Sequence, residues 1–188
     1  IFLIRLSKFH IRLFDDPGWQ ATRIIMIAYV RGNDTIDTGG GNDIVIGGTG
    51  SDTIHTESGD DIVLGDSGSA DFNTDLDVGV DPSHYGILRT ITTLSPTIGD
   101  ADTITTDEGA DIVIGGTAGD TITVGIGNDI VLGDNGFAQF TETGTLQTVS
   151  SDLTLVGQAE AATNIGGSDT ITTGRSEEHT SELQSHLN

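Results

Sequence analysis

The chain has 188 residues, a formal net charge of -22 and no cysteine. So acidic a chain repels polyanions, which excludes binding to nucleic acid or to an anionic membrane surface. Without cysteine there is no disulfide framework, so a thin hydrophobic core would need another kind of cross-link, for which a metal ion is the obvious choice.

Residues 1–31 differ from the rest of the chain. They hold most of the basic residues and the only tryptophan and methionine, Trp19 and Met26. They lack the continuous apolar stretch of a signal peptide or a transmembrane helix, so we expect no membrane insertion. The segment is either foreign or out of frame, or else a genuine flanking strand or helix.

Residues 32–70 form the first block of a nine-residue repeat. Its period is marked by four aspartates: Asp34, Asp43, Asp52 and Asp61. Two residues after each aspartate stands a β-branched residue, such as Ile36 after Asp34. A unit with one inward aliphatic residue cannot bury its apolar face alone, so it must stack on copies of itself.

A second block, residues 99–138, follows a spacer, residues 71–98. Its aspartates are Asp102, Asp111, Asp120 and Asp129. Another spacer, residues 139–165, precedes the start of a third block at 166–174. Segments 88–93 and 146–151 in the spacers alternate apolar and polar residues, which predicts a half-buried strand in each.

Both blocks end in the same way. In loops 65–70 and 133–138, alanine replaces the terminal aspartate, so the column of carboxylates should stop there. Asp66 and Asp134 stand early in these loops and could supply the missing oxygen. The nonapeptides are therefore nested in a larger repeat of about 68 residues, made of a short roll and a spacer.

Residues 175–188 follow the third block abruptly. Most of them look like the translation of a sequencing-library adapter rather than protein, so they carry no functional weight.

The two kinds of tripeptide alternate along each block, Asp-Thr-Ile with Asp-Ile-Val. One coil therefore has two strands and two turns, and advances by one strand spacing, about 4.8 Å. Asp34 would then lie over Asp52, and Asp43 over Asp61 on the opposite edge. Two carboxylates so close repel each other by roughly 1 kcal/mol even in water, and a hard cation between them reverses the sign.

The stretch 47–55, Gly-Gly-Thr-Gly-Ser-Asp-Thr-Ile-His, resembles the RTX nonapeptide repeat of calcium-binding β-rolls in secreted bacterial proteins. The resemblance implies an all-β fold, a right-handed parallel β-roll in two short blocks separated by β-rich spacers. It also implies calcium ligands from loop aspartates and backbone carbonyls. Besides the eight repeat aspartates with Asp66 and Asp134, the expected site residues are Gly32, Gly41, Gly48, Gly50, Gly59, Gly109, Gly116 and Gly127.

The pattern departs from this motif at four glycine positions, where Glu57, Asp100, Asp107 and Ala118 stand. The carboxylate positions are therefore better defined than any particular carbonyl.

Calcium is the only expected cofactor, and no catalytic arrangement of serine, histidine and acid stands out. By the resemblance the chain is secreted or on the bacterial surface, exported by type I secretion. The favoured hypothesis is that the chain is a calcium-stabilised structural module of an adhesin-like shaft. Its expected partners are the neighbouring repeats of a longer chain, and the sequence does not identify a surface or matrix ligand. One alternative is the secretion and folding roll of an exported enzyme or cytolysin. Another is an ice-binding solenoid, suggested by Thr-Ile-Thr at 103–105, 121–123 and 170–172.

The two faces of the roll are unequal. Beside the Asp-Ile-Val strands the outward residues are large and aliphatic, and they include Ile44, Ile62, Ile112 and Ile130. Monomers seldom expose a contiguous patch of this kind. We therefore predict that the spacer strands cover this face within the same chain.

Overall fold

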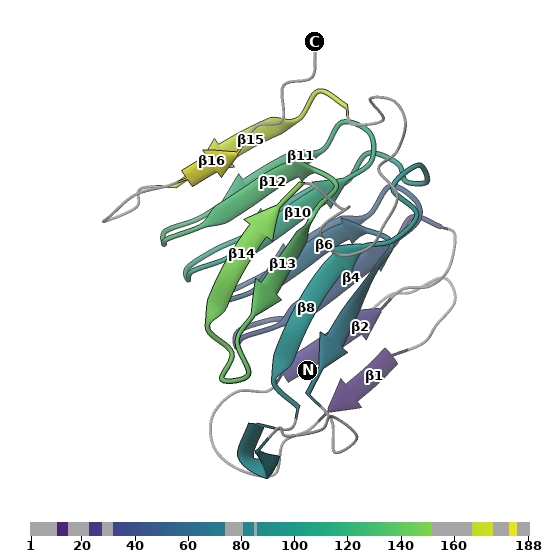
Figure 1. Cartoon of the computed structure of the whole chain (residues 1–188). Helices are drawn as coiled ribbons and strands as arrows, with labels where there is room; N and C mark the ends of the chain where they lie inside the picture. Colours follow the sequence, from purple (N-terminus) through teal and green to yellow (C-terminus); the bar gives the residue numbers. More distant parts are fainter. Residues whose placement is uncertain are drawn as a thin grey trace.

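The computed structural model describes residues 11–14, 23–27, 32–73, 81–84, 86–151, 167–174 and 181–183. Nearly all regular structure in these ranges is β-strand, with one short 3-10 helix, η1 (Pro82–His84). No helix in this part of the chain is long and apolar enough to cross a membrane. The strands form three sheets (Figure 1), which confirms the predicted all-β fold.

The first sheet, which we call the threonine sheet, contains the strands that follow each Asp-Thr-Ile turn. Its order is β15-β11-β9-β5-β3, and all neighbours are parallel. The strands are β3 (Thr35–Asp37), β5 (Thr53–Thr56), β9 (Thr103–Thr106), β11 (Thr121–Val124) and β15 (Thr170–Thr173).

The second sheet, which we call the isoleucine sheet, contains the Asp-Ile-Val strands. Its order is β1-β2-β4-β6-β10-β12-β16, parallel throughout except for the β1–β2 pair. The strands are β1 (Ile11–Phe14), β2 (Arg23–Ile27), β4 (Ile44–Gly48), β6 (Ile62–Asp66), β10 (Ile112–Gly116), β12 (Ile130–Asp134) and β16 (Ser181–Leu183). The two flanking segments of the chain thus extend this sheet at its ends.

The two blocks, although separated in the sequence, stack directly on each other. β5 pairs with β9, and β6 pairs with β10, so Ile54 lies beside Ile104 and Val63 beside Val113. Their inward aliphatic side chains form one core between the two sheets: Ile36, Val45, Ile54, Val63, Ile104, Val113, Ile122, Val124 and Val131. We expected the column of carboxylates to stop at the end of each block. This expectation is wrong, because in the folded chain the next block continues the stack of coils.

The spacers fold into a third, antiparallel sheet of order β14-β13-β8-β7, which we call the covering sheet. Its strands are β7 (Gly68–Phe72), β8 (Leu88–Thr93), β13 (Phe137–Phe140) and β14 (Leu146–Ser150). The predicted spacer strands are confirmed as β8 and β14. β7 and β13 were not predicted, because they begin inside segments that follow the loop pattern.

The covering sheet packs on the outer face of the isoleucine sheet, in front of it in Figure 1. Ile44 and Ile112 are only 3% and 7% exposed, and Ile62 and Ile130 are partly buried against the same cluster. Ile91 and Phe140 contribute to this second core from the covering sheet. The predicted intramolecular cover is confirmed, and burial at about 25 cal/mol per Å² of apolar area stabilises it.

The chain leaves the roll where an aspartate replaces a glycine. In β4 and β10, Gly48 and Gly116 have φ angles of 110° and 120°, which only glycine adopts readily. Asp66 and Asp134 stand beside them in the neighbouring strands and do not adopt a positive φ. The chain therefore continues extended toward the covering sheet instead of turning back into the roll.

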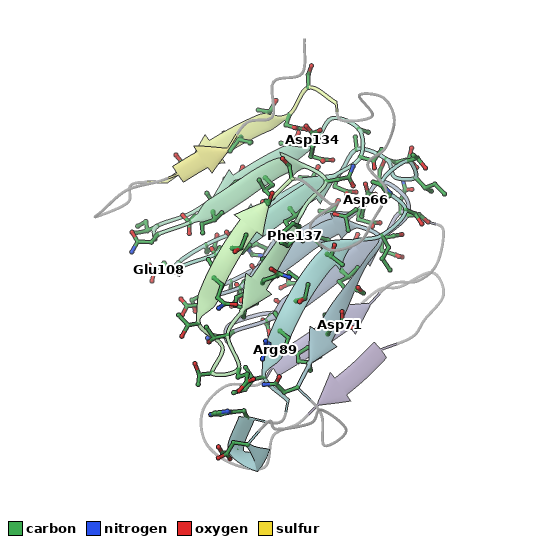
Figure 2. The ribbon with its side chains drawn as sticks, viewed as in Figure 1. Asp66, Asp71, Arg89, Glu108, Asp134 and Phe137 are labelled. Atoms are coloured by element: carbon green, nitrogen blue, oxygen red, sulfur yellow. The ribbon has the colours of Figure 1, made fainter. Side chains whose placement is uncertain are left out.

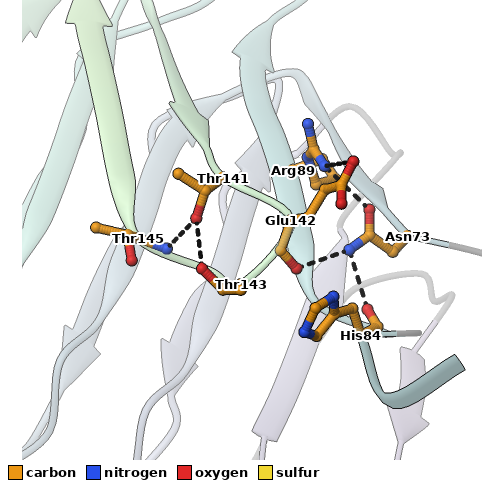
Figure 3. Close-up of polar contacts among 7 residues, drawn as sticks. All are labelled: Asn73, His84, Arg89, Thr141, Glu142, Thr143 and Thr145. Carbon is orange, nitrogen blue, oxygen red and sulfur yellow. Dashed lines mark hydrogen bonds and ion pairs between the residues drawn. The ribbon is translucent and has the colours of Figure 1, made fainter. Parts of the chain in front are cut away.

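A polar cluster joins the two spacers at the far end of the covering sheet (Figure 3). The side-chain amide of Asn73 donates hydrogen bonds to the carbonyl oxygens of His84 and Glu142, both at 3.0 Å. Arg89 donates to Asn73 Oδ1 at 3.4 Å and lies 3.8 Å from the Glu142 carboxylate. Asn73 is 3% exposed, so these contacts satisfy a buried amide and fix one spacer against the other.

Candidate metal centre

The repeat aspartates form two columns, one along each edge of the roll. The first edge carries Asp34, Asp52, Asp102, Asp120 and Asp169, each just before a strand of the threonine sheet. The second edge carries Asp43, Asp61, Asp111 and Asp129, each just before a strand of the isoleucine sheet. Figure 2 shows Asp66 and Asp134 on the side of the first edge and Glu108, from a second-edge loop, on the opposite side.

Successive aspartates in a column are joined by a hydrogen bond. On the first edge the backbone N–H of Asp34, Asp52, Asp102 and Asp120 each donates to Oδ1 of the next aspartate, at 2.7 to 2.9 Å. On the second edge Asp43, Asp61 and Asp111 donate in the same way at 2.8 to 3.1 Å. Each accepting carboxylate is therefore held in a fixed orientation with one of its oxygens committed.

The other carboxylate oxygen faces the interior of the loops. Oδ2 of Asp52, Asp61, Asp102, Asp111 and Asp120 is buried and accepts no hydrogen bond. A buried charged group without a partner is expensive, by several kcal/mol for an ion. A cation beside each of these oxygens is the partner that the chain itself does not supply.

The electrostatics of the loops are unfavourable. Burial is the main cause that raises the pKa of Asp102 to about 9 and of Asp120 to about 8, and neighbouring carboxylates add to the rise. Burial also raises the pKa of Asp52, Asp61 and Asp111 to about 6. Such groups favour either a proton or a metal ion, since both neutralise the buried charge.

A carboxylate oxygen and a carbonyl oxygen lie close to the glycine at the first position of three first-edge loops, those that begin at Gly47, Gly65 and Gly115. A methyl group on Gly65 would overlap Oδ2 of Asp102 and the carbonyl oxygen of Gly115. A methyl group on Gly115 would overlap Oδ2 of Asp120 and the carbonyl oxygen of Gly133. A carboxylate oxygen and a carbonyl oxygen from the next rung thus converge on one place, which is the ligand chemistry that Ca²⁺ prefers.

Acidic side chains alone do not build these sites. Among the described residues, no three His, Asp or Glu side chains are grouped to hold a metal ion. The available donors are instead one or two carboxylates together with loop carbonyls. This mixed oxygen set fits a hard cation such as calcium, and does not fit the nitrogen and sulfur preferences of zinc.

The second edge differs from the first at the leading loop position. Here Thr38, Thr56 and Thr106 replace glycine, and all three are at most 1% exposed. The hydroxyl groups of Thr56 and Thr106 offset part of the rise in the pKa of Asp61 and Asp111, although they do not reach standard hydrogen-bond geometry. A buried side chain thus stands at this position of the second edge, where the first edge has none, so we expect the first edge to bind cations more strongly.

The predicted glycines bring the loop backbones together. The N–H of Gly32 and Gly41 donates to the carbonyl oxygens of Thr49 and Ser58 in the next rung, at 2.9 and 2.7 Å. A methyl group on Gly50 would overlap the carbonyl group of Gly32. The same relation links the remaining glycines: Gly59 to Gly41, Gly109 to Gly59 and Gly127 to Gly109.

Ala118, one of the departures from the motif, keeps the backbone conformation of the glycine that it replaces. Its φ angle is 80°, which costs an alanine about 1 kcal/mol or more.

One feature of the loops was not predicted. The fifth loop position forms its own ladder, in which Asn42 Oδ1 accepts from the N–H of Asp60 at 3.0 Å and Asp60 Oδ1 accepts from the N–H of Ala110 at 2.9 Å. Asn33 accepts from Ser51 at 3.2 Å on the other edge. The recurrence of Asn or Asp immediately before the repeat aspartates was the available signal.

Asp66 and Asp134 lie at the points where the chain leaves the roll, next to the first-edge column. The Asp66 carboxylate is fully buried and accepts a hydrogen bond from the N–H of Thr117. Asp66 and Asp134 both act electrostatically on Asp120, so they belong to the same charged region. The structure therefore brings these two residues together with Asp102, Asp120 and Asp169, and separates them from the second edge.

A family model, described as the RTX calcium-binding nonapeptide repeat (4 copies), matches residues 31–54, 37–69 and 105–137. No curated protein and no solved structure matches the chain. The matched segments contain seven of the nine aspartates in the two columns; Asp102 and Asp169 lie outside them. The matched segments of the roll are therefore RTX calcium-binding nonapeptide repeats, a family of repeats that binds calcium.

Proposed function

We propose that this chain is a calcium-dependent structural module, in which calcium ions along the first edge join successive coils of the roll. The observation that carries this proposal is the row of buried Oδ2 atoms without a hydrogen-bond partner, each beside a carbonyl oxygen of the next coil. The carboxylates and loop glycines described above are the proposed ligands, with weaker sites along the second edge.

The role of calcium is then to stabilise the fold. Neutralising the buried carboxylates removes their mutual repulsion and the cost of burying them, so ion binding and folding form one equilibrium. Extracellular calcium modules typically work at roughly 10⁻⁴ to 10⁻³ M, far above cytosolic calcium. Such a module stays unfolded inside the cell and folds outside it.

RTX repeats occur in secreted bacterial proteins. The nested repeat of about 68 residues supports a shaft-like module, because each copy adds coils to one continuous roll and strands to one covering sheet. An adhesin-like surface protein exported by type I secretion is the proposed context, with no catalytic role for the module. A secretion and folding roll of an exported enzyme or cytolysin is the alternative, although such a role needs no tandem copies.

Limited proteolysis of the full chain tests the proposal. With calcium in the millimolar range the roll should resist cleavage, and with excess chelator it should be degraded rapidly, because the open chain is the substrate. Equal resistance in both conditions would contradict calcium-dependent folding.

The stacking of the blocks also supports ice binding as a second candidate. Three Thr-Ile-Thr segments lie side by side in the threonine sheet, with Thr121 paired to Thr103 and to Thr170. Their outer threonines form ranks on a solvent-facing surface, while Asp37 and His55 interrupt the ranks on the other coils. An ice-recrystallisation assay decides this question, with Thr121→Lys as the variant that should abolish any activity.

A further inference from the structure

The loop at the junction of the two blocks is assembled from two distant segments. Asp66 ends β6, and β7 of the covering sheet starts at Gly68. The chain returns to the roll through residues 99–102, where Asp102 resumes the aspartate column. The first part of this loop therefore comes from the segment that leaves the roll, and its last part comes from the segment that returns to it.

The side chain of Asp66 lies between these two segments. Its carboxylate is 0% exposed, accepts a hydrogen bond from the N–H of Thr117, and leaves Oδ1 buried without a partner. A methyl group on Gly99 or Gly116 would overlap this carboxylate, so the returning segment and the next loop both close around it. Oδ1 thus lies in an enclosed polar space without a hydrogen bond of standard geometry, although the N–H of Asp100 and the hydroxyl of Thr117 offset part of the rise in the pKa of Asp66 that burial causes.

Other oxygen atoms lie in the same composite loop. Asp102 has a buried Oδ2 without a partner, and the charge of Asp66 helps to raise the pKa of Asp102. The carbonyl oxygen of Gly115 and Asp102 Oδ2 both lie against the leading position of the composite loop, Gly65. Carboxylate and carbonyl oxygens are the ligands that a hard cation such as calcium prefers.

We propose that Asp66 and Asp102 hold a calcium ion of their own at this junction, and that this ion clasps the two ends of the spacer and so docks the covering sheet. The inference rests on the calcium-binding role proposed above and deepens it. Asp66 stands where the repeat has glycine, beside Gly48, so the site lies outside the nonapeptide pattern. Asp134 takes the same place beside Gly116 at the second junction.

Hydrogen bonds next to the proposed ion site connect it to the segments that flank the covering sheet. The carbonyl oxygen of Pro96, in the returning segment, accepts from the hydroxyl of Thr117 and from the side-chain amide of Asn135, both at 3.2 Å. The N–H of Leu94 donates to the carbonyl oxygen of Ser67 at 2.8 Å, where the chain departs. Without the ion, repulsion between Asp66 and Asp102 opens the junction on which β7 and β8 depend.

Asp66→Asn in the full chain tests the clasp, because asparagine keeps the shape and one acceptor but removes the charge. Asp71→Asn, on an exposed position of β7, is the matched control. Hydrogen exchange is followed while calcium is titrated, comparing amides of β4 and β5 in the roll with amides of β7 and β8. Equilibrium dialysis counts the bound calcium ions.

The expected result is that Asp66→Asn binds one calcium ion fewer than wild type. Half-maximal protection of β7 and β8 should need about tenfold more calcium, while β4 and β5 keep the wild-type midpoint. An unchanged ion count overturns the proposal, and so does an equal shift of all four strands. Asp71→Asn should match wild type in every measurement.

The two proposals fail in different ways. If wild type binds no calcium, the proposed function fails and the clasp fails with it, whereas an unchanged ion count in Asp66→Asn removes only the clasp. Should Asp66→Asn not fold at any calcium concentration, the wild-type titration decides. In that titration the amides of β7 and β8 must gain protection together with or after the amides of residues 115–120. Protection of β7 and β8 at a lower calcium concentration overturns the clasp.

Discussion

The backbone N–H of Asp52 donates a hydrogen bond of 2.7 Å to Oδ1 of Asp102, across a sequence separation of 50 residues. The corresponding bond from Asp34 to Asp52 spans 18 residues. The roll therefore continues through the junction as though the spacer were absent. The spacer is an insertion that returns to its point of departure, and it covers the apolar face on its way.

We expect an interior aspartate of the first edge to affect more than one ion. Asp52 lies between two coils, with one oxygen bonded to the lower coil and the other beside the upper one. Asp52→Ala should lower the calcium count by more than one in titration calorimetry. Asp71→Ala, on an exposed position of the covering sheet, should leave it unchanged, and equal losses for both would contradict the proposed ligands.

A methyl group at a leading glycine should block an ion site without removing any ligand. Gly47→Ala places a carbon 2.9 Å from Oδ2 of Asp52 and against the carbonyl oxygen of Gly65. Calcium affinity should fall by about 10-fold or more, as for other disturbances next to a metal ligand. The control is Gly40→Ala, whose methyl would lie 3.2 Å from the flexible hydroxyl of Ser58; an equal loss there would argue against the site.

Protons should partly replace calcium. Burial raises the pKa of Asp102 to about 9 and of Asp120 to about 8 from an ordinary value of 3.8. The folded state then holds protons that the unfolded state releases. This contribution to stability is fully present below about pH 4 and is lost as the pH rises through about 8 to 9.

The measurement is circular dichroism in excess chelator, which should show more β structure at about pH 5 than at about pH 9. Calcium should remove most of this difference and bind more tightly at the higher pH, since it competes with protons for the same carboxylates. A β signal in chelator that rises with pH would contradict the assigned burial of these carboxylates.

The covering sheet should contribute strongly to stability. Ile91 of β8 is fully buried against the isoleucine sheet, so Ile91→Ala should lower the free energy of unfolding in calcium by about 2 to 5 kcal/mol. Ile98→Ala, at a site 48% exposed, should change it by less than about 0.5 kcal/mol. Urea unfolding measures both, and equal effects would show that the cover is not a real core.

Much of this architecture follows from local pattern. The nine-residue step places Asp34 over Asp52 and turns Ile36 inward, and alternation in the spacers predicts β8 and β14. The stacking of one block on the next could not be predicted. It requires the chain to leave the roll, run through a spacer of more than 30 residues and come back to the same place, and no short-range rule describes such a path. The signal was present in Asp66, where a residue that disfavours positive φ interrupts a glycine position.

The carboxylate columns were predictable, whereas their inequality was not. The sequence assigns the same role to Asp52 and Asp61, yet one loop opens with Gly47 and the other with Thr56. Only the packed structure shows that Gly47, which has no side chain, lets Oδ2 of Asp52 and the carbonyl oxygen of Gly65 come close together, whereas the other loop has the buried side chain of Thr56 at this position. Likewise, the choice of acceptor for each backbone N–H depends on the register between coils.

Calcium-coupled folding is the central claim, and a titration of the full chain by far-UV circular dichroism tests it most directly. Calcium should raise the β signal cooperatively, with a midpoint near 10⁻⁴ to 10⁻³ M, as is typical of extracellular modules. Magnesium should be a poor substitute, since it demands near-octahedral geometry and keeps several of its waters. A full β signal in excess chelator at neutral pH, unchanged by either ion, would contradict the account.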